Sequence, residues 1–316
     1  MSVKVSVCIP IYGVEKYIER CARSLFEQTM KEGIEFIFVN DCTKDKSIEI
    51  LEKVLAEYPH RKDQVKIIHH EINGGLVAAR KTGLAHASGE YIIHCDSDDW
   101  VELDMYERMY NAAKEKDADI SYCSYVLDNG CGKKRNVFID SCADNKTLLK
   151  KMLSNNLHWS LTTKLIKAEI AKSSDLYQPD HICFSEDLLL STQMVARCRK
   201  VVYTPSPFYH YFQNNAASFT KTLNRSSWEQ LRETVDFLEK YLPKQFDLSV
   251  CKADVLFKAV FYGLTTAQEF KQYSKNWKRK VLSAKGFSKI KRLILLCSFF
   301  SYTGTRFFIR ILRCIK

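Results

Sequence analysis

Three carboxylates close together form the strongest chemical signal in this sequence of 316 residues. Asp96, Asp98 and Asp99 follow the apolar run 91–95 directly, with Ser97 between the first two. Such closely spaced carboxylates repel one another, so a fold accommodates them best where a cation neutralises their charge. Oxygen ligands select hard ions such as Mg²⁺ or Mn²⁺, which leave positions free for phosphate oxygens. The alternative is a solvated turn in which Ser97 or Asp99 caps the next helix.

Other polar segments suit a nucleotide, although each is also compatible with an ordinary loop. Asp41 follows the apolar run 34–39, where a carboxylate can accept a hydrogen bond from a base or ribose. Tyr12 follows the first apolar run, where its ring can stack on a base. Asn73 opens a glycine-containing turn, and Arg80 lies further along the same segment. The chain lacks both G-x-x-x-x-G-K-[ST] and a G-x-G-x-x-G after the first strand, which disfavours P-loop and dinucleotide chemistry.

The elements that must position these residues alternate regularly over the first 125 positions. Apolar spacing predicts strands at 3–9, 34–39, 65–69, 91–95 and 119–125, and helices at 18–26, 48–58, 76–87 and 103–116. This alternation predicts an α/β fold with a mostly parallel sheet covered by helices on both faces. Ligands of such sheets bind beyond the carboxyl ends of the strands, where the polar segments lie. Beyond residue 130 the pattern weakens to a turn at 129–132, a strand at 201–204 and helices at 228–241 and 252–270.

Positive charge is concentrated at the C-terminal end of the chain. Glu269 is the last acidic residue and thirteen lysines and arginines follow it, so residues 1–269 carry a net charge of −2 although the whole chain carries +11. An enzyme that binds nucleic acid more often carries basic residues across its folded body, so we expect no nucleic-acid partner. The tail 270–316 places bases beside apolar clusters, which favours attachment to a membrane surface. The alternative is a packed helix with a solvated basic face.

Twelve scattered cysteines form no C-x-x-C pair, and a strand-like run begins almost at the first residue. We therefore expect reduced thiols and no cleaved leader, as in a cytoplasmic protein. Together with the basic tail, this predicts a peripheral location on the inner face of the cell membrane.

The motifs together resemble the family 2 glycosyltransferases, which have the GT-A nucleotide-sugar-binding fold. The matching segments are Pro10-Ile11-Tyr12-Gly13, Asn40 to Asp45, Asn73 to Arg80, and Asp96 to Trp100. The sequence departs from the family pattern where Gly13 and Asn40 replace an asparagine and an aspartate. The resemblance implies that the following residues bind a nucleotide sugar: Pro10, Tyr12, Asp41, Asn73, Arg80, Asp96 and Asp98. It also implies that Asp98 and Asp99 bind Mg²⁺ or Mn²⁺.

The resemblance is looser in the second half of the chain. By likeness to the family's E-D pair, Asp187 would be the general base that deprotonates the acceptor hydroxyl, with Glu186 beside it. The alternative is that this pair simply begins a helix. The segment Tyr209-His210-Tyr211 resembles the family's Y-x-Y segment that closes over the diphosphate. His210 would then contact metal or phosphate, or belong to a packed aromatic cluster.

The resemblance thus implies a metal-dependent, inverting enzyme that moves one sugar from a nucleotide diphosphate, most simply a UDP-sugar, to a glycan or lipid-linked glycan hydroxyl. We expect a GT-A domain over 1–222, with a donor-binding half at 1–125 and an acceptor-side half at 126–222. A helical region would follow at 223–316, ending in the basic tail. The competing functions are a nucleotidyltransferase, which would need a glycine-rich loop after the first strand, and a membrane-attached scaffold without turnover.

Overall fold

The computed structural model describes residues 2–154, 159–215, 223–275, 277–284 and 287–314. Contacts divide the chain into two compact units. The first comprises Met1–Leu148, Ser160–Asp180 and Leu190–Ser218, and the second comprises Leu149–Trp159, His181–Leu189 and Phe219–Lys316.

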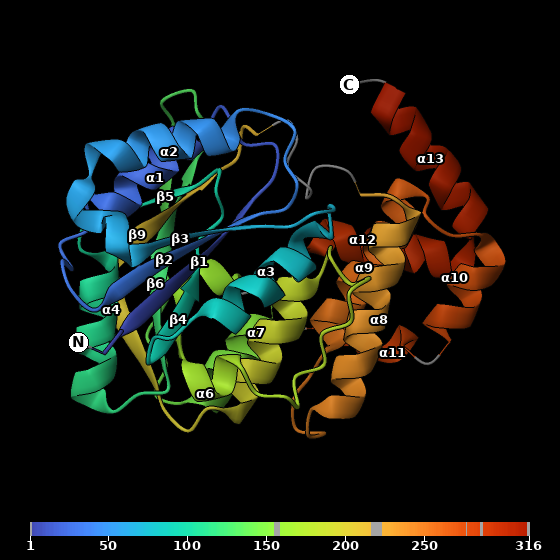
Figure 1. The fold of residues 1–316 in the computed structure, drawn as a ribbon. Coiled ribbons are helices and arrows are strands. Elements are labelled where there is room, and N and C mark those ends of the chain that lie inside the picture. The colour runs from blue at the N-terminus through green and yellow to red at the C-terminus, as the bar shows by residue number, and fades with distance from the viewer. Residues whose placement is uncertain (1, 155–158, 216–222, 276, 285–286, 315–316) are drawn as a thin grey trace. The chain divides into compact units, whose positions relative to one another are not determined.

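The predicted alternation of strands and helices is confirmed in the first unit. Its elements run β1 (Val5–Ile11), α1 (Ile18–Phe26), β2 (Ile34–Asn40), α2 (Ser47–Glu57), β3 (Val65–His69), α3 (Gly75–His86) and β4 (Tyr91–His94), with a short 3-10 helix at Pro59–Gln64. β1 pairs in parallel with β2 and with β4, and β2 pairs in parallel with β3. Figure 1 shows α1 and α2 on one side of these strands and α3 on the other. Both sides of β1, β2 and β4 are therefore buried, which explains their almost continuous apolar sequences, whereas the edge strand β3 is partly exposed.

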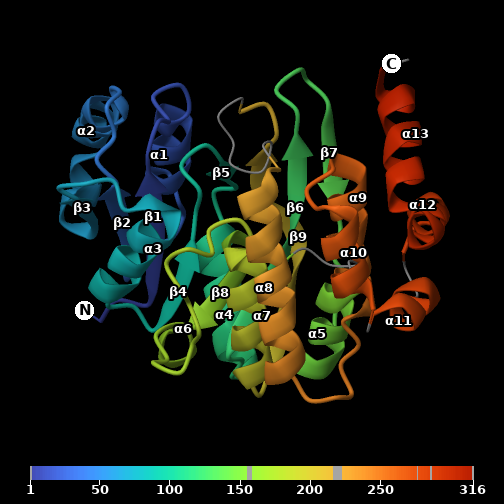
Figure 2. The ribbon, with the colours of Figure 1, turned by 90° about the vertical axis from the view of Figure 1, so that its right-hand side faces the viewer.

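The rest of the sheet is mixed. It contains β5 (Trp100–Val101), β6 (Ile120–Asp128), β7 (Lys134–Val137), β8 (Lys164–Lys167) and β9 (Val201–Phe212). The order is β3-β2-β1-β4-β8-β6-β9-β5, with β7 paired to β6. β8 lies antiparallel between β4 and β6 (Figure 2), a position that no local pattern in the sequence indicates.

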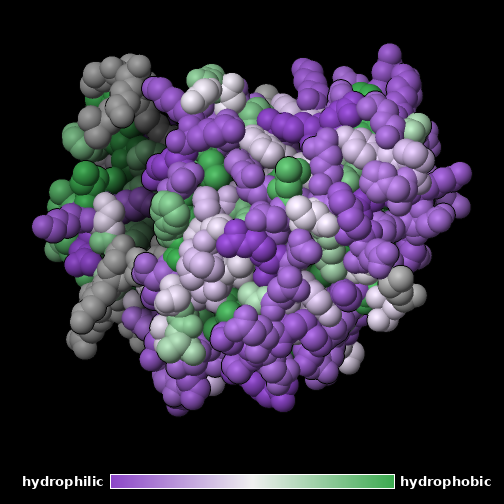
Figure 3. Space-filling model, turned by 90° about the vertical axis from the view of Figure 1, so that its left-hand side faces the viewer, coloured by the Kyte–Doolittle hydropathy of each residue, from purple (hydrophilic) through white to green (hydrophobic). Residues whose placement is uncertain are grey.

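Further helices lie between residues 105 and 197. They are α4 (Met105–Lys116), α5 (Asn145–Leu153), the short 3-10 helix Leu161–Thr163, α6 (Ala168–Ala171) and α7 (Glu186–Arg197). α5 and α7 each contain residues of both units. α4 packs on β6 and β9, and α3 packs on β1 and β2. The face of the first unit on the side of the N-terminus is largely hydrophilic (Figure 3).

The strand predicted at 201–204 is too short, because β9 continues to Phe212. Pro205 and Pro207 lie inside β9, although proline usually ends a strand. Here the pairing of β9 with β6 shifts register around these prolines, between Cys123 and Tyr125 of β6. The bulge lets the strand continue, and this extension carries Tyr209 and His210 to the edge of β5.

The second unit is helical among the residues that the structure describes. It contains α8 (Arg225–Tyr241), α9 (Ser249–Tyr262), α10 (Ala267–Ser274), α11 (Lys278–Ser283), α12 (Lys289–Phe300) and α13 (Tyr302–Cys314). The single helix predicted at 252–270 is wrong. α9 ends where Gly263 adopts a left-handed conformation (φ +69°), and Thr266 caps α10 by accepting a hydrogen bond from Glu269 N at 3.2 Å.

The C-terminal helices bury one side and expose another. Leu295 of α12 and Ile309 of α13 are buried, and the Arg306 guanidinium donates to the backbone oxygens of Val260 and Phe261 at the end of α9. Apolar side chains nevertheless stand exposed along both helices: Ile290, Leu293, Leu296 and Phe300 on α12, and Phe307, Phe308 and Ile311 on α13. Within the described ranges, no helix combines the length and apolar character needed to cross a bilayer.

Candidate functional site

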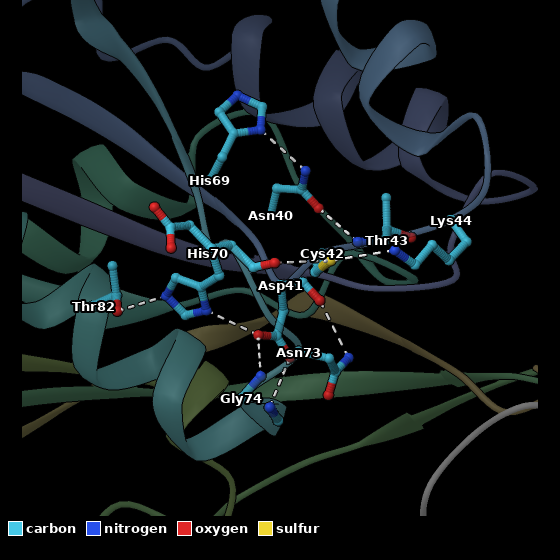
Figure 4. A network of polar contacts seen from close by, with 12 residues as sticks. Asn40, Asp41, Cys42, Thr43, Lys44, His69, His70, Asn73, Gly74 and Thr82 are labelled. Carbon is cyan, nitrogen blue, oxygen red and sulfur yellow. Dashed lines mark hydrogen bonds and ion pairs between the residues drawn. The ribbon is translucent and has the colours of Figure 1, made fainter.

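Asp41, just after β2, is buried and lies at the centre of a polar network (Figure 4). Its Oδ1 accepts hydrogen bonds from Gly74 N and His70 Nδ1, and its Oδ2 accepts one from Gly75 N, all at 2.8 Å. The Asn73 side-chain amide donates to Asp41 O at 3.1 Å. Asp41 therefore fixes the turn that begins α3, where Gly75 has a φ of +82°. Its predicted contact with a nucleoside stays a prediction, since both carboxylate oxygens already accept bonds from the protein.

His70 is a member of this network that the motif analysis missed. It follows β3, and its Nε2 contacts Thr82 Oγ1 of α3 at 2.8 Å. Its position could have indicated a role in the site, because His70 follows the carboxyl end of the third strand and so lies at the same edge of the sheet as Asp41.

The loops after β1 and β2 are joined by hydrogen bonds. Gly13 N donates to Thr43 Oγ1 and Glu15 N donates to Asp45 Oδ2, both at 2.9 Å. Burial alone would raise the pKa of Asp45, but the hydrogen bonds that its carboxylate accepts lower it. These contacts hold the first loop in place while the Tyr12 ring remains 57% exposed, so the ring is free to contact a planar ligand.

Arg80 and Asp96, both predicted site residues, are brought together by the fold. Arg80 lies on α3 and is buried, and its Nη2 donates to Asp96 Oδ1 at 2.8 Å. The ion pair joins the third helix to the loop after β4 and supplies one positive charge to the carboxylate cluster. Asp96 keeps 31% of its side chain exposed.

Asp98 is a half-buried carboxylate. Its Oδ2 accepts a hydrogen bond from the Asn215 side chain at 2.8 Å, and its backbone oxygen accepts one from Arg20 Nη2 at 3.0 Å. Burial and the nearby charge of Asp96 raise the pKa of Asp98. The surroundings thus compensate its negative charge incompletely.

Asp99 differs from Asp98 in being completely buried. Its Oδ2 accepts from the Tyr209 hydroxyl at 2.6 Å and its Oδ1 from Phe212 N at 2.7 Å. Burial, followed by the charges of Asp98 and Asp96, raises the pKa of Asp99 well above its usual range. Asp99 was predicted to bind metal together with Asp98, but its burial and its two accepted hydrogen bonds favour an anchoring role toward β9.

His210 belongs to an aromatic cluster beside these carboxylates, one of its two predicted settings. Its ring stacks on Trp100 with centroids 4.8 Å apart and planes 11° apart, and its Nε2 lies 2.6 Å from Glu102 Oε1. The Arg20 guanidinium covers Trp100 at 3.6 Å. The cluster packs β5 against β9, and no spacing in the sequence pairs residue 20 with residue 100.

Glu186 and Asp187 begin α7 and belong to the second unit. The preceding segment is held by α8, since the Gln230 side-chain oxygen accepts from Cys183 N and Phe184 N, both at 2.9 Å. Glu186 is buried, whereas Asp187 is half-buried. Its role as a general base stays a prediction.

With this geometry in place, comparison with known proteins identifies the family. The sequence model described as glycosyl transferase family 2 matches residues 6–169, just over half of the chain. The chain belongs to glycosyl transferase family 2. The match includes the network around Asp41, the Arg80–Asp96 pair and the whole carboxylate cluster.

Relatives of this family 2 chain include bacterial glycosyltransferases. It is 31% identical over 218 residues to glycosyltransferase EpsJ of Bacillus subtilis, covering 66% of this chain and 61% of that protein. It is 29% identical over 290 residues to the cholesterol galactosyltransferase of Borreliella burgdorferi, covering 87% and 77%. The chain therefore spans less than two thirds of EpsJ, and it spans 32% of the poly(ribitol-phosphate) beta-glucosyltransferase of Bacillus spizizenii.

Solved structures share the fold at low identity. TarS 1–349 of S. aureus in complex with UDP-GlcNAc has a TM-score of 0.73 and 18% identity, covering 99% of this chain and 93% of that one. A mannosyltransferase of Pyrobaculum calidifontis in complex with GDP-Man and Mn²⁺ has a TM-score of 0.56 and 14% identity, covering 98% and 84%. The predicted α/β GT-A fold is thereby confirmed.

Proposed function

We propose that this chain is a metal-dependent, inverting glycosyltransferase that moves one sugar from a UDP-sugar to a hydroxyl of a glycan or lipid-linked glycan. The observation that carries the proposal is the carboxylate cluster after β4, joined to Arg80 within the family 2 segment. Support for the donor comes from a neighbour in fold that was solved in complex with UDP-GlcNAc, and support for a polymeric acceptor comes from a relative described as a poly(ribitol-phosphate) beta-N-acetylglucosaminyltransferase.

The residues present fit a divalent cation that is shared with the donor. Within the described ranges, no group of three or more His, Cys, Asp or Glu could hold a metal ion. Mg²⁺ commonly binds through one or two carboxylates and completes its shell with substrate phosphates and water. Asp98 would supply the principal protein ligand, with Asp99 holding the loop behind it. A bound Mg²⁺ or Mn²⁺ would offset the negative charge that grows on the departing diphosphate.

The remaining chemistry falls to side chains of the protein. Tyr12 would stack on the base, Pro10 and Asn73 would line the nucleoside, and Asp41 would hold the turn that begins α3. Asp187 would accept the proton of the acceptor hydroxyl as its oxygen attacks the anomeric carbon. The bond from that carbon to the diphosphate breaks on the opposite side, so the anomeric configuration inverts. Positioning the two reactants supplies much of the acceleration.

Calorimetric titration with UDP, with and without Mn²⁺, tests the donor site. We expect Mn²⁺ to tighten UDP binding in the wild type, and Asp98→Asn to abolish that gain while leaving metal-free binding within about twofold. Asp63→Asn, which changes an exposed aspartate of the same unit, serves as the control. Failure of the wild type to bind UDP under either condition would contradict the proposal. NMR of the sugar product then tests inversion.

We also propose that α12 and α13 attach the protein to the inner face of the cell membrane. Their exposed apolar side chains include Leu293 at 60% and Phe300 at 87% exposure, and the bases Lys289 and Arg310 are exposed on the same helices. Apolar groups at the acyl boundary and bases on anionic headgroups describe an interfacial segment.

Co-sedimentation with vesicles of phosphatidylcholine alone, or with added phosphatidylglycerol, tests this attachment. The Leu293→Ser/Phe300→Ser double variant should bind anionic vesicles at least about tenfold more weakly, since burying one such side chain contributes about 1.5–3 kcal/mol. Phe138→Ser, at a phenylalanine of the first unit that is 69% exposed, is the matched control. Equal vesicle binding by the double variant and the control would exclude these helices as the anchor.

A further inference from the structure

Tyr209 joins two ends of the loop that carries the acidic cluster. Its hydroxyl donates to Asp99 Oδ2 at 2.6 Å and accepts a hydrogen bond from Asp96 N at 3.1 Å. Both Tyr209 and Asp99 are buried, with 1% and 0% exposure. One phenolic oxygen therefore closes the loop from its first aspartate to its last, although Tyr209 lies 110 residues beyond Asp99.

Residues that follow Tyr209 reinforce this closure. Phe212 N binds the other oxygen of Asp99, and Asn215 binds Asp98 Oδ2. Immediately after the loop, β5 pairs antiparallel with β9, with Val101 opposite Tyr209. The acidic loop is thus held at Asp96 and Asp99 by β9, and at Asp98 by Asn215, which follows that strand.

These contacts matter for cation binding because the loop is acidic. Three carboxylates in four residues tend to separate, and a loop free to do so would have to be reorganised each time a cation bound. Hydrogen bonds from behind the ligand fix its orientation in advance, and loss of such a partner typically weakens metal affinity or activity by about 10–100-fold. Asp99 is the point of attachment, because its two oxygens face β9.

We propose that the Tyr209 hydroxyl is a positioning group that holds Asp98 in its metal-binding orientation by fastening Asp99 and Asp96. The family resemblance suggested instead that this segment closes over the diphosphate, but the Tyr209 hydroxyl faces the acidic loop. This inference rests on the proposed metal-dependent donor site.

Tyr209→Phe removes one oxygen and keeps the ring, and Tyr203→Phe is its matched control. Tyr203 lies on the same strand, and its hydroxyl lies 2.7 Å from Ser124 Oγ, away from the acidic loop. We expect both variants to lose some thermal stability. Only Tyr209→Phe should lose the Mn²⁺-dependent gain in UDP affinity, by about tenfold or more, while its metal-free affinity for UDP stays near the wild-type value.

Titration of UDP with and without Mn²⁺ distinguishes the outcomes. An equal Mn²⁺-dependent gain in Tyr209→Phe and Tyr203→Phe would overturn the positioning role. Absence of any gain in the wild type would instead refute the proposed donor site. If Tyr209→Phe does not fold, Asn215→Ala tests whether contacts from the segment 209–215 orient Asp98, since it removes the hydrogen bond to Asp98 Oδ2 and should also reduce the gain.

Discussion

Replacing Asp41 by asparagine separates a structural role from a ligand-binding role. The carboxylate accepts three hydrogen bonds, from Gly74 N, Gly75 N and His70 Nδ1. In Asp41→Asn an amide NH₂ replaces one oxygen, so at least one donor faces another donor, and the remaining bonds lose the charge that strengthened them.

The cost can be estimated from these contacts. Hydrogen bonds to charged groups contribute about 1.5–3 kcal/mol each, so one lost and two weakened bonds amount to about 3 kcal/mol. For a unit of this size we expect Tm to fall by roughly 6–12 °C. UDP affinity should fall as well, because the turn at the start of α3 is released.

Thermal unfolding followed by circular dichroism measures the first effect, and calorimetry with UDP measures the second. Asp63→Asn removes an exposed carboxylate and should change stability by less than about 0.5 kcal/mol. The reasoning is refuted if Asp41→Asn keeps the Tm of the wild type but loses its affinity for UDP. That result would mean that Asp41 serves the nucleoside and not the turn.

Three further predictions concern stability. Burial and nearby Arg80 lower the pKa of His94 to about 3 from 6.5, so the unfolded chain takes up a proton below pH 6.5 that the fold excludes. Urea unfolding should therefore show a loss of about 2 kcal/mol between pH 7.5 and 5, and His94→Gln should flatten this profile. Gly75→Ala should lower the free energy of unfolding by about 1–2 kcal/mol and weaken UDP binding. Gly132 also has a positive φ and lies in open space, so Gly132→Ala should lower the free energy of unfolding without affecting UDP binding. Burial alone would raise the pKa of Glu35, but hydrogen bonds from Lys66, Ser6 and Ser88 lower it. The ionised Glu35 therefore stabilises the folded protein above pH 4.5, and this contribution is lost in acid. The free energy of unfolding of Glu35→Gln should accordingly depend less on pH.

The parallel part of the fold could be predicted because the patterns that specify it lie within short segments of the sequence. The buried runs of β1, β2 and β4 and the helical spacing between them are visible within short windows of sequence. Because parallel strands end at one edge, the sequence also predicted that Asp41 and Asp96 lie at the same edge of the sheet. The structure adds that Arg80 links that edge to α3.

Contacts between distant segments could not be predicted in this way. Nothing in the spacing shows that Tyr209 binds Asp99, or that β8 inserts between β4 and β6. Pro205 and Pro207 pointed away from a long strand, and the bulge that accommodates them depends on β6. The break at Gly263, by contrast, was readable, because a glycine followed by Thr266 and Glu269 is a helix end and a capping box.

The dependence of the acidic loop on β9 has a consequence for biosynthesis. During translation, the aspartates of the acidic loop are synthesised more than 100 residues before the residues that hold them, which are Tyr209, Phe212 and Asn215. At a translation rate of about 5–20 residues per second, these carboxylates lack those hydrogen bonds for roughly 5–20 seconds. During that interval β1 to β4 can already form a sheet, yet the acidic loop lacks this support. A truncated product that ends before residue 208 would contain every carboxylate of the cluster and none of the partners that the segment 209–215 supplies.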